Sequence, residues 1–108
     1  MTSSTVLWTQ TALSDLTAII DHIAAENPNA ALDVLQRLQA RAEALADLAP
    51  RGRVVPELRD IGVNQYRELI ERPWRLVYRT DGARTVMIAV LDARRDLDSL
   101  LLERLTRL

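Results

Sequence analysis

The chain has 108 residues, a net charge of −1 and a charged fraction of 27%, which suits one domain with a core of its own. It has no cysteine and one histidine, which excludes disulfides, thiolate metal sites and a histidine metal cluster. No apolar run approaches the roughly 18 residues of a membrane span, and the first residues lack a signal-like apolar segment. We therefore expect a single cytoplasmic domain over residues 1–108, with no membrane contact, no cofactor and no metal ion.

The first predicted elements are a short strand and a helix. Residues 5–9 have the bulk and alternation of a strand. Thr11 is expected to cap the helix, with Asp15 in the first turn, where the helix dipole favours an acid. Apolar residues then recur at helical spacing as far as Ile23, which predicts an amphipathic helix.

A second helix is predicted to begin at the Asn27-Pro28 pair, with Asn27 as the cap and Pro28 in the first helical position. Its apolar residues recur at alternating steps of four and three, and the helix is expected to run to about Ala49. The short connection makes the two helices an antiparallel hairpin. His22, in the first helix, is expected to be a packing or surface residue rather than a general base.

The rest of the chain predicts a sheet closed by a helix. Residues 51–63 are expected to be irregular, and residues 65–80 form two strands joined at Pro73. Asp81-Gly82 predicts a hairpin turn into a buried strand over residues 85–91. Asp96 is expected to cap a last helix.

The order β-α-α-β-β-β-α predicts an α+β fold. In it, an antiparallel helical hairpin and a C-terminal helix pack on one face of a small, mostly antiparallel sheet. The position of the first strand within the sheet stays open.

The charges are unevenly distributed, and all 14 basic residues are arginine. Arginines outnumber acids between Arg51 and Arg95, whereas acids outnumber arginines before Arg51. Genome composition could explain the arginine usage, and so could a site that needs planar, permanently charged groups. The basic sheet half and the acidic helical half suggest two faces with different partners.

Arginines recur along the predicted strands, with Arg67, Arg75 and Arg79 on adjacent strands and Arg94 after the next one. One interpretation is a solvated sheet face whose arginine stems cover apolar surface. The other is a patch that binds phosphate or carboxylate groups through bidentate forks. The spacing alone leaves both interpretations open.

Several segments together point to a known family. They are Trp8, Ala12 with Asp15-Leu16, Asn27-Pro28 with Ala31, Gly62 with Tyr66-Arg67-Glu68-Leu69, Trp74-Arg75-Leu76-Val77-Tyr78, and Arg94-Arg95-Asp96-Leu97. In this order the chain resembles the RelE/ParE superfamily of toxins from type II toxin–antitoxin pairs. The resemblance covers nearly the whole chain, and the family fold is the β-α-α-β-β-β-α arrangement.

The resemblance implies one of two mechanisms. RelE-like members cut messenger RNA on the ribosome with basic residues on the sheet and, in many cases, a C-terminal tyrosine or histidine, whereas ParE-like members poison DNA gyrase. Leu69 and Leu100 stand where a lysine and the aromatic acid–base residue would be expected. Arginine stays protonated and is a poor base, while RNA cleavage needs both an acid and a base. The chain therefore resembles the ParE-like branch more closely.

The leading hypothesis is a toxin without catalytic residues that inhibits gyrase by direct binding. A cognate antitoxin would neutralise it, and operator DNA would be reached only through that antitoxin. The predicted target-binding residues are Arg53, Arg59, Arg67, Arg75, Arg79, Arg94 and Arg95. The predicted antitoxin-binding residues are Leu35, Leu38, Leu45 and Trp74.

Two alternatives remain. In a ribosome-dependent messenger RNA endoribonuclease, Arg67, Arg75 and Arg94 would hold the scissile phosphate, and the ribosome and messenger RNA would be the partners. A non-toxic relic would only bind its antitoxin.

Overall fold

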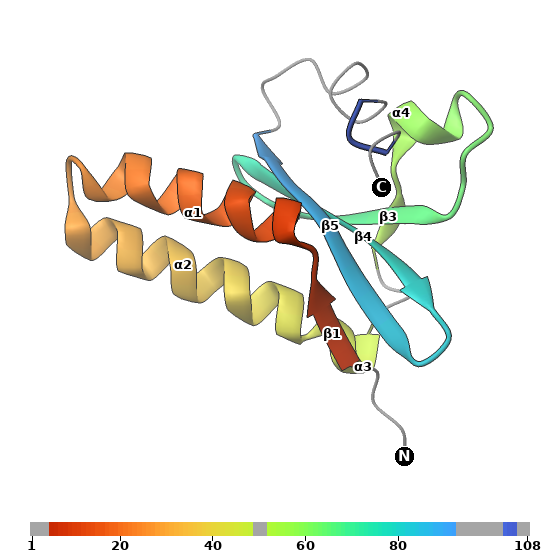
Figure 1. The fold of residues 1–108 in the computed structure, drawn as a ribbon, viewed down its shortest axis with the longest axis horizontal. Helices are drawn as coiled ribbons and strands as arrows, with labels where there is room; N and C mark the ends of the chain where they lie inside the picture. The colour runs from red at the N-terminus through yellow and green to blue at the C-terminus, as the bar shows by residue number, and fades with distance from the viewer. Residues whose placement is uncertain (1–4, 49–51, 93–102, 106–108) are drawn as a thin grey trace.

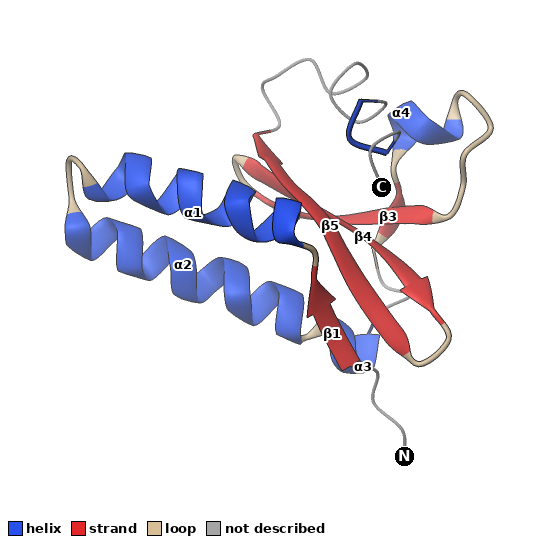
Figure 2. Cartoon of the chain, in the orientation of Figure 1, coloured by secondary structure: helices blue, strands red, loops and turns tan. Residues whose placement is uncertain are grey.

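A central sheet organises the molecule. The computed structural model describes residues 5–48, 52–92 and 103–105. The sheet has five strands in the order β1-β5-β4-β3-β2, with the α1–α2 hairpin beside it (Figure 1). The strands are β1 (Thr5–Trp8), β2 (Arg53–Val54), β3 (Tyr66–Glu71), β4 (Trp74–Asp81) and β5 (Arg84–Asp92). The helices are α1 (Gln10–Ala24), α2 (Pro28–Glu43), α3 (Leu45–Leu48) and α4 (Pro56–Arg59) (Figure 2).

The predicted α+β class and the mostly antiparallel sheet are confirmed. The pairs β2–β3, β3–β4 and β4–β5 are antiparallel, whereas β1 pairs with β5 in parallel. The first strand therefore forms an edge of the sheet, which the sequence left open. Its last pairing joins Trp8 to Met87, so β5 continues to Asp92 without a strand partner on that side among the described residues.

The start of α1 differs from the prediction. Thr9 is the N-cap, because its Oγ1 accepts a hydrogen bond from the Ala12 backbone N–H at 3.1 Å. The same hydroxyl donates to the Met87 carbonyl at 2.9 Å and so ties the helix start to β5. The prediction that Thr11 caps the helix is wrong, and Asp15 lies beyond the first turn.

The start of α2 is as predicted, and its end is earlier. Asn27 Oδ1 accepts from the Ala30 N–H at 3.1 Å, and Pro28 takes the first helical position. The helix ends at Glu43, and α3 is a separate short helix. The predicted end at Ala49 lies outside the described residues.

The sheet is covered on both faces, whereas the prediction placed helices on one face only. Residues 51–63, predicted to be irregular, contain β2 and α4. Val55 and Leu58 are fully buried and pack with Val77 and Ile88 against the face opposite the α1–α2 hairpin. The hairpin face holds a second cluster, which includes Ala12, Leu16, Leu38, Leu76, Tyr78 and Val90. The sequence did not reveal α4, because a single turn of helix is too short to show an apolar periodicity.

The predicted C-terminal helix lies mostly outside the described residues, as does its expected cap, Asp96. Residues 103–105 are helical. Leu105 packs, half-buried, against the cluster on the α4 face.

Candidate functional site

The predicted arginine patch is divided between the two faces of the sheet. The β3–β4 pairing is regular throughout, so alternate residues point to opposite faces. Arg75 and Arg79 point to the α4 face. Arg67, which pairs with Tyr78, points to the hairpin face. The strands therefore separate arginines that the sequence placed in one patch.

Arg75 is a buried member of an ionic network rather than a free cation. Its Nη1 and Nη2 donate to the two carboxylate oxygens of Glu57 at 2.6 and 2.7 Å. Its Nε donates to Glu68 Oε1 at 2.6 Å. The residue is 6% exposed, so both faces of the guanidinium are shielded from water. Neutralising carboxylates on two sides allow a charge to be buried this deeply.

Glu68 links this network to a second arginine. Its side chain is fully buried and accepts from Arg53 Nε at 2.6 Å as well as from Arg75. Hydrogen bonding to Arg75 lowers the pKa of Glu57 and outweighs the opposing effect of burial. Hydrogen bonding to Glu57 in turn raises the pKa of Arg75. The four side chains together carry no net charge.

Arg67 holds the segment before β2 on the hairpin face. Its Nη1 donates to the Gly52 carbonyl at 2.7 Å, and the Gly52 N–H donates to Tyr78 Oη at 2.9 Å. Burial raises the pKa of Tyr78, which keeps the phenol protonated near neutral pH. Arg67 and Tyr78 therefore act on the chain's own backbone here.

The remaining predicted arginines are on the surface or outside the described residues. The side chains of Arg53 and Arg59 are more than half exposed, and Arg79 is about one-third exposed. The acids nearest Arg59 and Arg79 are 3.9 and 3.8 Å away. Contacts of this kind are weak in water. Arg94 and Arg95 lie outside the described residues.

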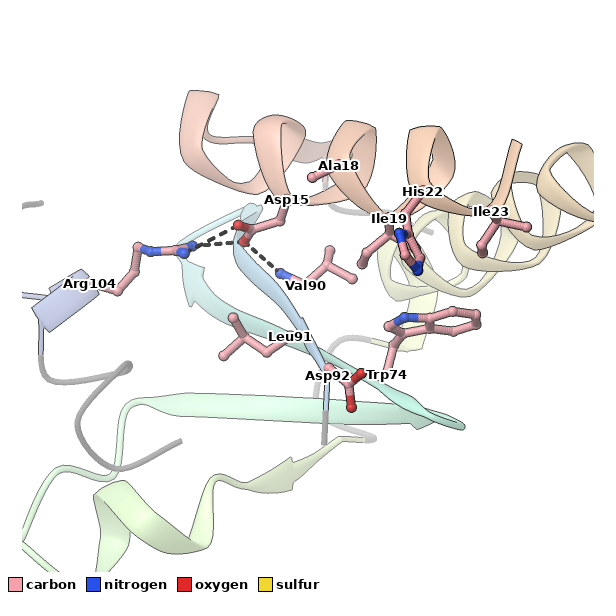
Figure 3. Close-up of a pocket in the computed structure, with 10 residues that line it drawn as sticks. All are labelled: Asp15, Ala18, Ile19, His22, Ile23, Trp74, Val90, Leu91, Asp92 and Arg104. Atoms are coloured by element: carbon pink, nitrogen blue, oxygen red, sulfur yellow. Dashed lines mark hydrogen bonds and ion pairs between the residues drawn. The ribbon is translucent and has the colours of Figure 1, made fainter. Parts of the chain in front are cut away.

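A pocket of about 430 Å³ lies between α1 and the end of the sheet (Figure 3). Ile19 and Ile23 of α1 form one wall, and Trp74 of β4 and Val90 of β5 lie across from them. His22, an exposed residue of α1, also lines it. The pocket is thus mainly apolar, with polar groups at its ends.

Asp15 closes one end of this pocket. Its Oδ2 accepts from the Val90 N–H at 3.0 Å and from Arg104 Nη1 at 2.7 Å, and its Oδ1 accepts from Arg104 Nη2 at 3.2 Å (Figure 3). Since β1 stops pairing at Met87, the carboxylate takes the place of a strand partner for Val90. Asp15 therefore joins α1, β5 and the C-terminal segment.

This role of Asp15 was missed in the sequence. One signal was available: Asp15, Ile19 and His22 follow one another at steps of four and three, so all three share one side of the helix. A carboxylate on the apolar side of a helix becomes buried when the helix packs, and it then needs a hydrogen-bonding or charged partner. The partners themselves, Val90 and Arg104, are too distant in sequence to be found this way.

The four residues predicted to bind an antitoxin differ in exposure. Leu38 and Leu45 are fully buried in the core, so a partner on the surface cannot reach them. Leu35 and Trp74 are partly buried at its margin, and Trp74 also lines the pocket. Of the four, Leu35 and Trp74 are therefore the two that a partner could contact at the surface.

Among the residues that the structure describes, no three histidine, cysteine or acidic side chains come together as a metal site. None of the described helices is long and apolar enough to cross a membrane. Two surface features are suited to binding a partner: the exposed arginines around α4 and the apolar pocket beside Trp74.

The chain is similar to known toxins in sequence. Residues 6–97 match the family model described as "ParE toxin of type II toxin-antitoxin system, parDE". A curated relative, Toxin RelE2 of Caulobacter vibrioides, is 47% identical over 49 residues. Those residues are 45% of this chain and 56% of the relative, so the match spans little more than half the relative's length.

Solved structures share the fold. The "Chromosomal ParDE TA system from P. aeruginosa" matches with a TM-score of 0.67 and 26% identity, over 83% of this chain and 96% of the other. The toxin–antitoxin complex RelBE2 from Mycobacterium tuberculosis matches with a TM-score of 0.56 and 20% identity, over 85% of this chain and 93% of the other. The second likeness concerns the fold alone. Because the family model covers most of the chain, the protein belongs to the ParE toxin family of type II toxin–antitoxin systems.

Proposed function

We propose that the protein is a toxin that inhibits DNA gyrase by direct binding and has no catalysis of its own. The match of residues 6–97 to the ParE family model supports this proposal. In this proposal, a cognate antitoxin neutralises the toxin, and operator DNA is contacted only through the antitoxin.

The contacts that the sheet arginines already make are what favours gyrase binding over RNA cleavage. Arg75 already holds two carboxylates, and Arg67 holds the Gly52 carbonyl. An arginine that fixes a scissile phosphate needs its donors free. The sequence also has no histidine or tyrosine after Tyr78 to transfer a proton. Both features favour inhibition by binding over RNA cleavage.

The exposed arginines around α4 are the proposed target-binding surface. Arg53, Arg59 and Arg79 present guanidinium groups to solvent, with Arg94 and Arg95 as further candidates from the sequence. Such groups suit an acidic or mixed protein surface. The pocket beside Trp74, together with Leu35, is the proposed antitoxin contact, because partly exposed apolar side chains suit a partner's apolar residues.

A gyrase cleavage assay tests the proposal. Purified protein is incubated with gyrase, ATP and supercoiled plasmid. We expect linear DNA trapped with gyrase to accumulate, and the addition of antitoxin to abolish it. Normal supercoiling without linear DNA, with circular dichroism showing a folded protein, would contradict gyrase inhibition.

The second candidate is a ribosome-dependent endoribonuclease. The 47% identity over 49 residues to Toxin RelE2 favours it. Arg67, Arg75 and Arg94 would then bind the phosphate, which requires Arg75 to release Glu57. Primer extension on messenger RNA after induction tests it: cuts at defined codons favour cleavage, and intact messages oppose it. Normal growth on expression of the folded protein without antitoxin would favour the non-toxic relic instead.

A further inference from the structure

Two arginines and two glutamates meet where α4 packs on the sheet. They are Arg53, Glu57, Glu68 and Arg75. The inner pair is dry, since the side chains of Arg75 and Glu68 are 7% and 0% exposed. The outer pair reaches solvent, with Glu57 25% and Arg53 61% exposed. The network therefore has a buried inner pair and an outer pair at the surface.

The donors of Arg75 serve both glutamates, and Nη2 is shared between them. Nε donates to Glu68 Oε1 and Nη2 lies 2.5 Å from the same oxygen, while Nη1 and Nη2 donate to the two oxygens of Glu57 at 2.6 and 2.7 Å. This is the fork geometry in which a guanidinium binds any carboxylate or phosphate. Glu57 thus occupies the place that a free oxyanion would take.

The backbone of α4 does not depend on Glu57 for its position. Val55 and Leu58, on either side, are fully buried against the sheet. Removing the Glu57 carboxylate would therefore leave a space lined by the Arg75 donors and open to water. Glu68 would then face two arginines alone, and the site would carry a net positive charge.

We propose that Arg75 and Arg53 form an oxyanion-binding site whose bound ligand is the carboxylate of Glu57. Glu57 is then the residue that keeps phosphate and carboxylate groups off this face of the sheet. The ligand class is a small oxyanion, either phosphate or a free carboxylate. The inference depends on the sheet face alone and is independent of the toxin's target.

An anion-rescue experiment tests the site. Thermal unfolding of Glu57→Ala is measured in sodium phosphate, in sodium acetate and in sodium chloride at equal ionic strength. Asp60→Ala is the matched control, because it removes the same charge from an exposed side chain beside α4. We expect phosphate or acetate to raise the Tm of Glu57→Ala above its value in chloride by about 4 °C or more at saturating anion. The wild type and Asp60→Ala should show no such difference.

The two salts identify the anion. A response to phosphate alone assigns a tetrahedral oxyanion, and a response to both salts assigns a general carboxylate or phosphate site. Equal responses of Glu57→Ala and Asp60→Ala would overturn the proposal. A Glu57→Ala protein that folds in phosphate or acetate but not in chloride would show the same rescue. A Glu57→Ala protein that fails to fold in all three salts would overturn the proposal, because the anion then does not replace the carboxylate.

Discussion

At the residue scale, Gly52 shows how closely the chain passes over the sheet. Its N–H donates to Tyr78 Oη, and its carbonyl accepts from Arg67 Nη1. A Cβ built at this position would lie 2.3 Å from Tyr78 Oη and 2.7 Å from the Glu68 carbonyl oxygen. The absence of a side chain is therefore what lets the segment before β2 approach β3 and β4.

We expect Gly52→Ala to lower the free energy of unfolding by about 1–3 kcal/mol, the usual effect of overpacking. Urea denaturation measures the change. The double variant Gly52→Ala/Tyr78→Phe removes the hydroxyl contact and should be less destabilised than the sum of the two single variants. An unchanged stability of Gly52→Ala would contradict the close approach.

The ion pair between Glu57 and Arg75 is expected to stabilise the fold less at acid pH than at neutral pH. Arg75 lowers the pKa of Glu57 below the 4.5 of an unperturbed glutamate. The unfolded chain therefore binds this proton more readily, and stability is lost as the pH falls through the lowered pKa. Above about 4.5 the contribution is fully present.

The check compares urea denaturation of the wild type and Glu57→Gln over the acid range. We expect the wild type to be the more stable protein at neutral pH, and the difference to shrink as Glu57 is protonated. A difference that stays constant from neutral to acid pH would show that the pair with Arg75 does not depend on this charge.

At the element scale, α1 is fastened to the sheet at its start. Thr9 caps the helix and also donates to the Met87 carbonyl, so one hydroxyl serves both the helix and the β5 edge. Thr11, two residues later in the chain, has neither role.

We expect Thr9→Ala to destabilise the protein by about 1–2 kcal/mol, the usual cost of losing a threonine cap. Thr11→Ala is the matched control and should change stability by less than about 0.5 kcal/mol. Chemical denaturation of the two variants decides between the caps, and equal losses would contradict the role of Thr9.

Asp15 forms the second polar connection between α1 and β5. We expect Asp15→Ala to cost about 1–3 kcal/mol, because the buried Val90 N–H would lose its acceptor and Arg104 its partner. Asp21→Ala removes the same charge from the exposed side of α1 and should have little effect. Urea denaturation of both variants is the measurement, and equal losses would mean that charge alone is responsible.

At the scale of the whole molecule, the arginines that remain exposed lie apart from the apolar pocket. Arg53, Arg59 and Arg79 belong to β2, α4 and β4, whereas the pocket lies between α1 and the ends of β4 and β5. A target and an antitoxin could therefore use different surfaces of the same molecule.

We expect the triple variant Arg53→Ala/Arg59→Ala/Arg79→Ala to need about tenfold more protein for the same growth inhibition, equivalent to about 1.4 kcal/mol of binding. Arg37→Ala, an exposed arginine of α2, is the control and should remain as toxic as the wild type. Full toxicity of the folded triple variant would exclude these arginines from target binding.

The sequence by itself determined the local features of this protein. The Asn27 cap, the turn at Gly82 and the strands on either side of it follow from interactions within a few residues, which composition and spacing encode directly. The order of β1, α1, α2, β3, β4 and β5 could be predicted for the same reason, whereas β2, α3 and α4 could not.

Only the tertiary structure decided what the charged side chains do. Arg75 pairs with Glu57, which lies 18 residues away in the sequence, and Arg104 pairs with Asp15, which lies 89 residues away. The parallel pairing of β1 with β5 likewise brings together the first and the last strand in the sequence. A long side chain can pair with any of many acids, and its choice depends on burial and on which face of the sheet it occupies. Neither is fixed until the sheet has formed and both of its faces are covered.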